Sequence, residues 1–152
     1  MSTIEFELNR GKLGMTIYSP DTYYANIASD IDEFIKKKTG LIPVYRYEFR
    51  HSSKTIEKFY EPVVYKNIPH WHLVSKLFTT GPCLLTFWIG NNAINQLTGI
   101  KGKSHPKYAD KDTVRGKFLC DNAICNLIHT SDNKDEMIRE LFALGFYSLL
   151  KQ

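Results

Sequence analysis

The segment PCLLTFWI, residues 82–89, is almost wholly apolar and is bounded by Pro82 and Gly90. A strand with one face in solvent alternates polar and apolar side chains, whereas a strand covered on both faces is a short continuous apolar run. The segment therefore predicts a buried strand in the middle of a sheet.

Three further strand patterns lie on either side of this segment. KLGMTIY (residues 12–18) is a short strand pattern that stops at Pro20. PVYRYEFR (residues 43–50) alternates aromatic and polar side chains, as expected of a half-buried strand. AICNLI (residues 123–128) is a further short strand pattern, and His129 follows at its end. The chain thus offers four strands to one sheet.

Helical patterns separate these strands. Apolar residues recur at helical spacing from residue 22 to Gly40, and shorter helical stretches cover residues 53–60, 70–78 and 92–97. The polar segment 99–122 predicts a loop that is functional or mobile, because loops of this length are uncommon in compact domains.

A last helix is expected to begin at Ser131 or Asp132, with acidic side chains in its first turn. The residues that it is expected to bury are Met137, Ile138, Leu141 and Leu144. The order of strands and helices predicts an α+β fold, a ferredoxin-like antiparallel sheet with the helices packed on one face.

Length and composition point to one globular domain over residues 1–152, with 43% hydrophobic and 24% charged residues. No apolar run approaches the roughly 18 residues of a membrane span. The first twelve residues, MSTIEFELNRGK, lack the apolar block of a secretory signal, so we expect a cytoplasmic protein. The three cysteines form no CxxC pair, and we expect reduced thiols.

The net charge of +4 is scattered along the chain, apart from the lysines at 36–38 near a predicted helix C-terminus. A nucleic-acid-binding domain would need a clustered basic face or interleaved aromatic residues, so a nucleic-acid partner is not expected. A modest positive charge suits a protein that handles phosphates.

The motif around His129 carries the functional argument. The chain has TVRG at 113–116, NLIHTSD at 126–132, TGP at 80–82 and GKSHP at 102–106, and Glu140 follows in the last helix. In this order and spacing, the chain resembles the nucleoside diphosphate kinases from about Met15 to Phe146. The family has T-I-R-G, N-x-I-H-G-S-D, S-G-P and G-x-T-N-P at the corresponding places.

This resemblance implies a ping-pong phosphoryl transfer between nucleoside triphosphates and diphosphates, with His129 as the phosphorylated nucleophile. An imidazole, with an ordinary pKa of about 6.5, is mostly neutral at pH 7 and has a lone pair for attack. Glu140 matches the family glutamate that orients the ring, and Ser131 matches the serine beside the histidine.

The resemblance also implies a nucleotide site. Arg115 matches the arginine that grips phosphate oxygens, and Tyr60 and Ser104 match a tyrosine and a threonine that contact phosphate. Trp71 falls where a phenylalanine stacks on the base, and Asn126 matches the asparagine that contacts the sugar. Magnesium is the expected cofactor, and a homo-oligomer, usually a hexamer in the family, is the expected assembly.

Each of these residues also has a purely structural interpretation. A histidine at a strand end is more often a hydrogen-bonding residue, and Tyr60 and Trp71 could be core aromatics. Arg115 would ordinarily be a solvated charge in a loop. The pair His70 and His72 does not complete a metal-ligand set, so no metal site built from protein side chains is expected.

The chain departs from the family pattern at two cationic positions. Ser19 stands where the family has a lysine and Thr98 where it has an arginine, while Thr130 replaces the glycine after the histidine. Losing one preorganised donor costs around 3 kcal/mol, or about a hundredfold in rate. Lys101 or Lys103 could partly replace these cations. The alternative is a nucleotide-binding homologue with little turnover that acts as a regulatory subunit.

Overall fold

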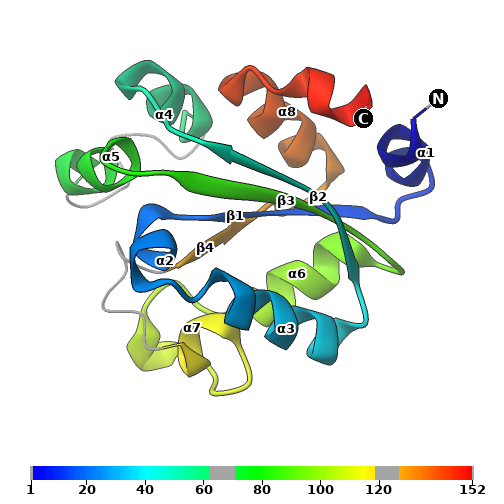
Figure 1. Cartoon of the computed structure of the whole chain (residues 1–152), viewed down its shortest axis with the longest axis horizontal. Coiled ribbons are helices and arrows are strands. Elements are labelled where there is room, and N and C mark those ends of the chain that lie inside the picture. The colour runs from blue at the N-terminus through cyan, green and yellow to red at the C-terminus, as the bar shows by residue number, and fades with distance from the viewer. Residues whose placement is uncertain (1, 62–70, 119–126, 152) are drawn as a thin grey trace.

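A computed structural model describes residues 2–61, 71–118 and 127–151. Its centre is a four-stranded sheet in the order β2-β3-β1-β4, in which every neighbouring pair is antiparallel (Figure 1). The strands are β1 (Leu13–Tyr18), β2 (Ile42–Phe49), β3 (Cys83–Ile89) and β4 (Ile128–Thr130). This arrangement confirms the predicted α+β, ferredoxin-like class.

The helices cover both faces of the sheet (Figure 1), so the prediction that they lie on one face is wrong. On one face lie α1 (Thr3–Asn9), α4 (Ser53–Phe59), α5 (Trp71–Thr79), α8 (Lys134–Leu144) and the 3-10 helix η2 (Tyr147–Lys151). On the other lie α3 (Ala28–Thr39), α6 (Ala93–Lys101) and α7 (Val114–Lys117). The 3-10 turn η1 (Pro106–Tyr108) contacts α7, and α2 (Pro20–Ala25) follows β1 directly.

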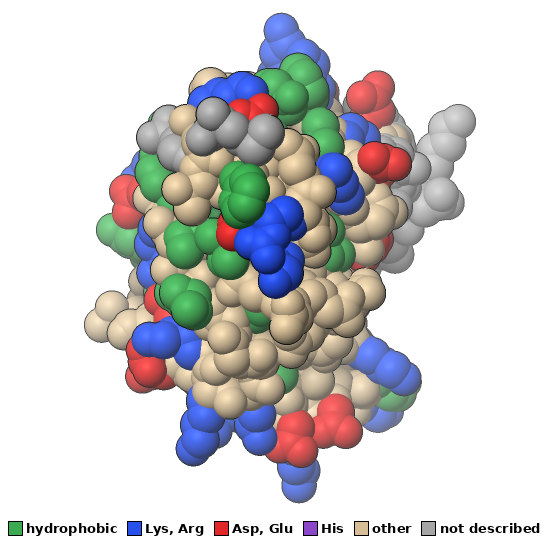
Figure 2. Space-filling view, turned by 90° about the vertical axis from the view of Figure 1, so that its right-hand side faces the viewer, with side chains coloured by type: hydrophobic (Ala, Val, Ile, Leu, Met, Phe, Trp, Pro, Cys, Tyr) green, Lys and Arg blue, Asp and Glu red, His purple; other side chains and the backbone are tan. Residues whose placement is uncertain are grey.

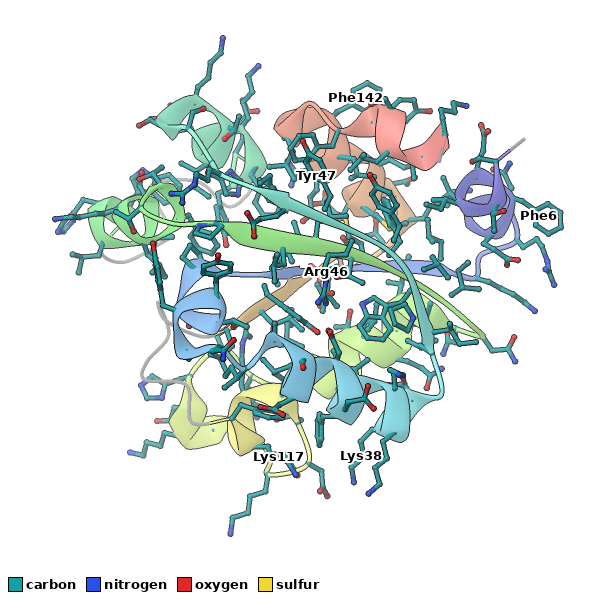
Figure 3. All side chains as sticks on the ribbon, in the orientation of Figure 1. Phe6, Lys38, Arg46, Tyr47, Lys117 and Phe142 are labelled. Carbon is teal, nitrogen blue, oxygen red and sulfur yellow. The ribbon has the colours of Figure 1, made fainter. Side chains whose placement is uncertain are left out.

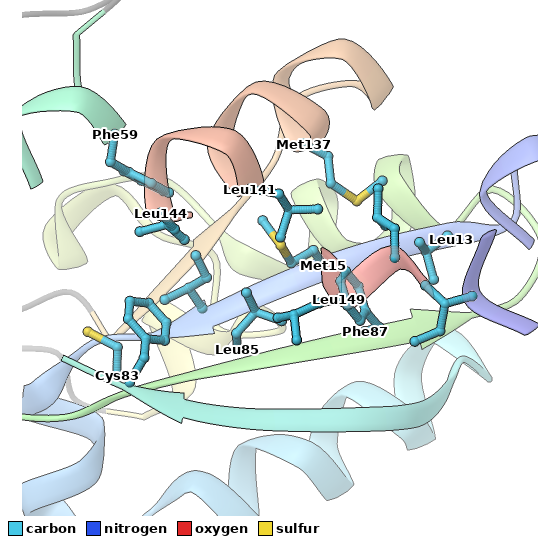
Figure 4. Packing of buried hydrophobic residues seen from close by; sticks show 14 of the residues in the cluster. Leu13, Met15, Phe59, Cys83, Leu85, Phe87, Met137, Leu141, Leu144 and Leu149 are labelled. Atoms are coloured by element: carbon cyan, nitrogen blue, oxygen red, sulfur yellow. The ribbon is translucent and has the colours of Figure 1, made fainter. Parts of the chain in front are cut away.

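Two hydrophobic cores result, one on each side of the sheet. Met15 and Ile17 of β1 point into the first core, which α8 closes with Met137 and Leu141 (Figure 4). Tyr18, on the opposite side of the strand, belongs to the second core. Because β1 and β3 are covered on both faces, their apolar sequences carry little alternation, and the central position predicted for residues 82–89 is confirmed.

Gly14 allows α6 to lie directly against β1. A Cβ atom at this position would come within 2.6 Å of Leu97 Cδ1 and 3.2 Å of the Ala93 backbone. Only a residue without a side chain permits this approach. The C-terminal end of α6 is thereby held beside β4, with which the helix also packs.

A polar cluster ties α3 to the second face of the sheet. Arg46 extends from β2 toward α3 (Figure 3) and its Nη2 lies 2.6 Å from Asp32 Oδ1. The same carboxylate oxygen accepts a hydrogen bond from the buried Tyr18 hydroxyl at 2.6 Å. Arg46 Nε also donates to Thr86 Oγ1 at 2.9 Å. These shared donors satisfy a carboxylate that is mostly removed from solvent.

The element boundaries differ from the sequence predictions at several places. The helix expected from residue 22 to Gly40 is two helices, because Asn26 adopts a left-handed conformation with φ 56°. The segment 99–122 contains the end of α6, η1 and α7, so its described part is not a plain loop. Most of the strand expected at 123–128 falls outside the described residues.

The surface carries mixed charges. On the face shown in Figure 2, basic and acidic side chains are interspersed. In the part of the chain that the structure describes, no helix has both the length and the apolar composition that a membrane span requires.

One buried histidine lies in the first core. His51 is 5% exposed, its ring contacts those of Phe49, Phe59 and Phe78, and its Nδ1 lies 3.0 Å from Thr55 Oγ1. Burial, and secondarily the charge of a second histidine nearby, lowers the pKa of His51 to about 4.

We expect His51 to make the domain sensitive to acid. The unfolded chain binds this proton near pH 6.5, whereas the folded chain binds it only near pH 4, so the stabilisation present above pH 6.5 is lost as the pH falls toward 4. The loss amounts to about 3 kcal/mol of unfolding free energy. His51→Phe, which keeps an aromatic ring, should flatten this dependence in urea denaturation between pH 7 and pH 4.

The matched control is His72→Gln, because His72 is exposed. It should keep the wild-type slope of stability against pH. Equal slopes for His51→Phe and the wild type would contradict the assignment of this acid sensitivity to His51.

Candidate active site

His129 lies in the middle of β4, at the edge of the sheet. It pairs with Ile17 of β1, and its side chain points to the face covered by α4 and α8 with 22% of its area exposed. The sequence predicts His129 directly after a strand over residues 123–128, whereas β4 begins at Ile128 and includes His129. A histidine so placed is fixed by the sheet yet reachable from solvent.

The peptide before His129 is held in an unusual conformation. Leu127 has φ 76°, a left-handed value that is rare for a branched side chain. Its N–H donates to Asp21 Oδ2 at 3.0 Å, and its carbonyl accepts bonds from Ser19 N at 3.0 Å and Thr22 Oγ1 at 2.7 Å. The start of α2 therefore pins the chain immediately before the candidate nucleophile.

Glu140 is a carboxylate on the buried face of α8. It is 3% exposed and lies beside Met137 and Leu141 on that face. Its Oε2 lies 2.8 Å from His129 Nε2, and its Oε1 accepts a bond from Ser131 Oγ at 2.5 Å. The structure thus brings the three predicted catalytic residues together.

Electrostatics determine which ring nitrogen of His129 carries a proton. Burial alone would raise the pKa of Glu140, but the charge of His129 and the hydrogen bonds from His129 and Ser131 outweigh it, so the pKa lies below its ordinary value. An ionised carboxylate only accepts hydrogen bonds, so Nε2 must be the protonated nitrogen. Nδ1, which has no hydrogen-bond partner among the described residues, then holds the lone pair.

Arg139 and Phe59 position the ring from the α4 side. The Phe59 ring packs edge-on against that of His129, with centroids 4.8 Å apart. Arg139 donates to the carbonyls of Phe59 at 2.9 Å and Lys58 at 3.2 Å, which ties the end of α4 to α8. No sequence signal identified these two residues, since neither contact follows from spacing along the chain.

Tyr60 and Trp71 lie next to this group. Tyr60 follows Phe59 at the end of α4, and its ring centroid lies 5.8 Å from that of Trp71, the first residue of α5. Burial, and then the negative charge of Glu140, raises the pKa of the Tyr60 hydroxyl well above its ordinary value. Both residues also pack against the first core, so they have structural as well as candidate binding contacts.

Arg115 is a buried arginine rather than a solvated one. It is 6% exposed, and its Nη2 donates to the Ile128 carbonyl at 2.6 Å while Nη1 donates to the Gly102 carbonyl at 3.1 Å. The guanidinium therefore joins α7 to β4 and to the end of α6, beside His129. Its fork of donors suits both this task and the binding of phosphate oxygens.

The remaining predicted residues are less closely connected. Ser104 is exposed, between α6 and η1, and no contact among the described residues links it to His129. Asn126 lies outside the described residues. Ser19 is buried and its hydroxyl donates to Asp21, whereas Thr98 Oγ1 donates to the Ser131 carbonyl at 3.3 Å. In the described ranges, no group of three His, Cys, Asp or Glu side chains is arranged to hold a metal ion.

Comparison with known proteins agrees with the motifs. The model of a family described as nucleoside diphosphate kinase matches residues 14–147. A nucleoside diphosphate kinase of Wolbachia sp. subsp. Brugia malayi (strain TRS) is 32% identical over 127 residues, which cover 84% of this chain and 88% of the relative. That of Ehrlichia ruminantium (strain Welgevonden) is 31% identical over 137 residues, 90% of this chain and 93% of the relative.

Solved structures agree in fold. The nucleoside diphosphate kinase of Encephalitozoon cuniculi superposes with a TM-score of 0.78 at 20% identity and covers 87% of each chain. The Halobacterium salinarum enzyme, solved in complex with CDP, gives a TM-score of 0.76 at 25% identity over 87% of this chain and 86% of that one. Because the family model spans both the sheet and the site at its edge, the chain belongs to the nucleoside diphosphate kinase family.

Proposed function

We propose that the protein is a nucleoside diphosphate kinase that transfers the terminal phosphate of a nucleoside triphosphate to a nucleoside diphosphate through a phosphohistidine at His129. The observation that carries this proposal is the bond of 2.8 Å between His129 Nε2 and a buried, ionised Glu140, which leaves Nδ1 as the available nucleophile. The names of the curated relatives support the same substrate class.

In the first half-reaction, the Nδ1 lone pair attacks the terminal phosphorus of the triphosphate. The bond from that phosphorus to its bridging oxygen breaks, and the electron pair leaves with the nucleoside diphosphate. The ring becomes more positive, and Glu140 stabilises it through the Nε2 proton, which stays in place. In the second half-reaction, a terminal oxygen of another nucleoside diphosphate attacks the phosphorus and the electron pair returns to Nδ1.

Trp71 would stack on the nucleotide base, and Tyr60 would contact phosphate. Trp71 begins α5 and is partly buried against Tyr60, which leaves part of the indole open. Stacking on an indole tolerates any base, because every base presents a π-face. Arg115, with its donors beside β4, would contact phosphate oxygens, and Ser104 and Asn126 would complete the phosphate and sugar contacts.

Magnesium fits this site as an ion carried by the nucleotide. Mg²⁺ usually binds substrate phosphates, waters and at most one or two carboxylates, so an all-protein cage is not required. When bound, the ion neutralises phosphate charge.

Incubation with Mg-ATP should leave acid-labile, base-stable phosphate on the protein, because a phosphohistidine has this stability pattern and a phosphoserine does not. His129→Ala should abolish the label. Glu140→Gln should slow labelling by roughly a hundredfold, because the amide no longer fixes the tautomer or balances the ring charge. The measurement is the rate of phosphoenzyme formation by rapid quench.

The matched control is Asp135→Asn, an exposed carboxylate in the first turn of α8, which should label at nearly the wild-type rate. Label that persists in His129→Ala would contradict the nucleophile assignment. A wild-type protein that binds nucleotide but takes up no phosphate would instead support the nucleotide-binding homologue without turnover.

Nucleotide binding should depend on magnesium and only weakly on the base. Calorimetry with ADP, GDP and CDP should give dissociation constants within about tenfold of one another, since stacking is tolerant of base identity. Trp71→Ala should weaken all three by a similar factor, whereas Leu73→Ala, which removes an exposed side chain of the same helix, should not. A hundredfold preference for one base would argue against recognition by stacking.

A further inference from the structure

Phosphoryl transfer at His129 needs positive charge to stabilise the phosphoryl oxygens. The two arginines near His129 are both hydrogen-bonded to backbone carbonyls. Arg139 donates to two carbonyls at the end of α4, and Arg115 donates to the carbonyls of Gly102 and Ile128. These bonds hold the site together. They also fix the position of each guanidinium, so additional positive charge at the phosphoryl group would have to come from another side chain.

Lys101 is a nearby cation whose side chain is not held by hydrogen bonds to the described backbone. It is the last residue of α6, and it is half-buried. Within the described ranges, its ammonium forms no hydrogen bond and no ion pair. Partial burial of an ammonium without a partner is unfavourable, so this position is poised for an anion that arrives from outside the chain.

The charged residues around Lys101 include Glu140, which is hydrogen-bonded to His129. Burial lowers the pKa of Lys101, and the positive charge of Arg115 adds to this effect, while the negative charges of Asp132 and Glu140 oppose it. The helix α6, which ends at Lys101, packs against β4, the strand that carries His129. Arg115 also contacts the carbonyl of Gly102, the residue immediately after Lys101.

Lys101 also faces open space. It lines an open pocket of 560 Å³, together with Thr98, Lys103 and Thr113 among others. A substrate phosphate can approach a side chain in such a wall. Lys103 lies in the same wall but is exposed, so water already solvates its charge.

We propose that the ammonium of Lys101 contacts the phosphoryl group in transfer and supplies charge stabilisation in addition to that of Arg115. This assignment rests on the phosphoryl transfer through a phosphohistidine that is proposed above. An ammonium is a compact charge with three donors, and it matches the spread of negative charge over the phosphoryl oxygens in the transition state. Lys101 thus compensates for Ser19 and Thr98, whose hydroxyls are engaged within the protein.

The test compares phosphotransfer from ATP to a nucleoside diphosphate in four variants. Lys101→Met should lower kcat by roughly a hundredfold with a smaller change in KM, because the contact strengthens in the transition state. Lys101→Arg should retain most activity. Lys103→Met, which removes an equal charge two residues away, should stay within about threefold of wild type.

Thr98→Arg combined with Lys101→Met provides the fourth variant. Thr98 lies one turn before Lys101 on α6, so a guanidinium there extends from the same side of the helix. This combination should raise the rate at least about tenfold above that of Lys101→Met alone. Circular dichroism and thermal melting of every variant separate loss of function from loss of fold.

A second measurement does not depend on turnover. Brief acetylation with acetic anhydride, followed by mass spectrometry, should modify Lys101 in the free protein, and Mg-ADP with inorganic phosphate should protect it more than Lys103. Unchanged kcat in Lys101→Met, an equal loss in Lys103→Met, or equal protection of both lysines would overturn the assignment. Absence of phosphohistidine in the wild type would instead overturn the proposed function, and this assignment with it.

Discussion

The site depends on one buried negative charge. Glu140 lies on the face of α8 that otherwise carries methionine and leucine side chains into the core, and an ionised carboxylate there is unfavourable unless donors surround it. His129 and Ser131 provide those donors from β4 and the residue that follows it. The pairing therefore fixes the distance between the edge of the sheet and the last helix. It also orients the imidazole, so the same bond serves the fold and the chemistry proposed for His129.

The arginines around this pair act mainly as connectors. Arg139 joins α8 to the end of α4, which holds Phe59 against the imidazole, and Arg115 joins α7 and α6 to β4. Arginine suits this task because its planar fork reaches two carbonyls at once and stays charged when buried. These bonds fix the position of each guanidinium beside the elements that carry His129 and Phe59.

Sequence patterns predicted the parts of the molecule that follow from local chemistry. The apolar run at 82–89 indicated the central strand, and the motif around His129 indicated the family and the grouping with Glu140 and Ser131. The placement of helices on both faces was not predictable from one chain, because an apolar stripe does not say which side of the sheet it covers. The left-handed Leu127 was hidden for a similar reason, since its support comes from Asp21, far away in sequence.

The bond between Arg115 and the Ile128 carbonyl has a consequence for solubility. β4 is an edge strand of three residues, and edge strands expose backbone groups that can recruit a strand from another molecule. Arg115 occupies one of these groups from within the chain. A substitution at Arg115 would reopen this edge as well as remove a charge, so an inactive Arg115 variant could be an aggregated one. Measurements on such a variant are informative about catalysis only for material that remains monodisperse.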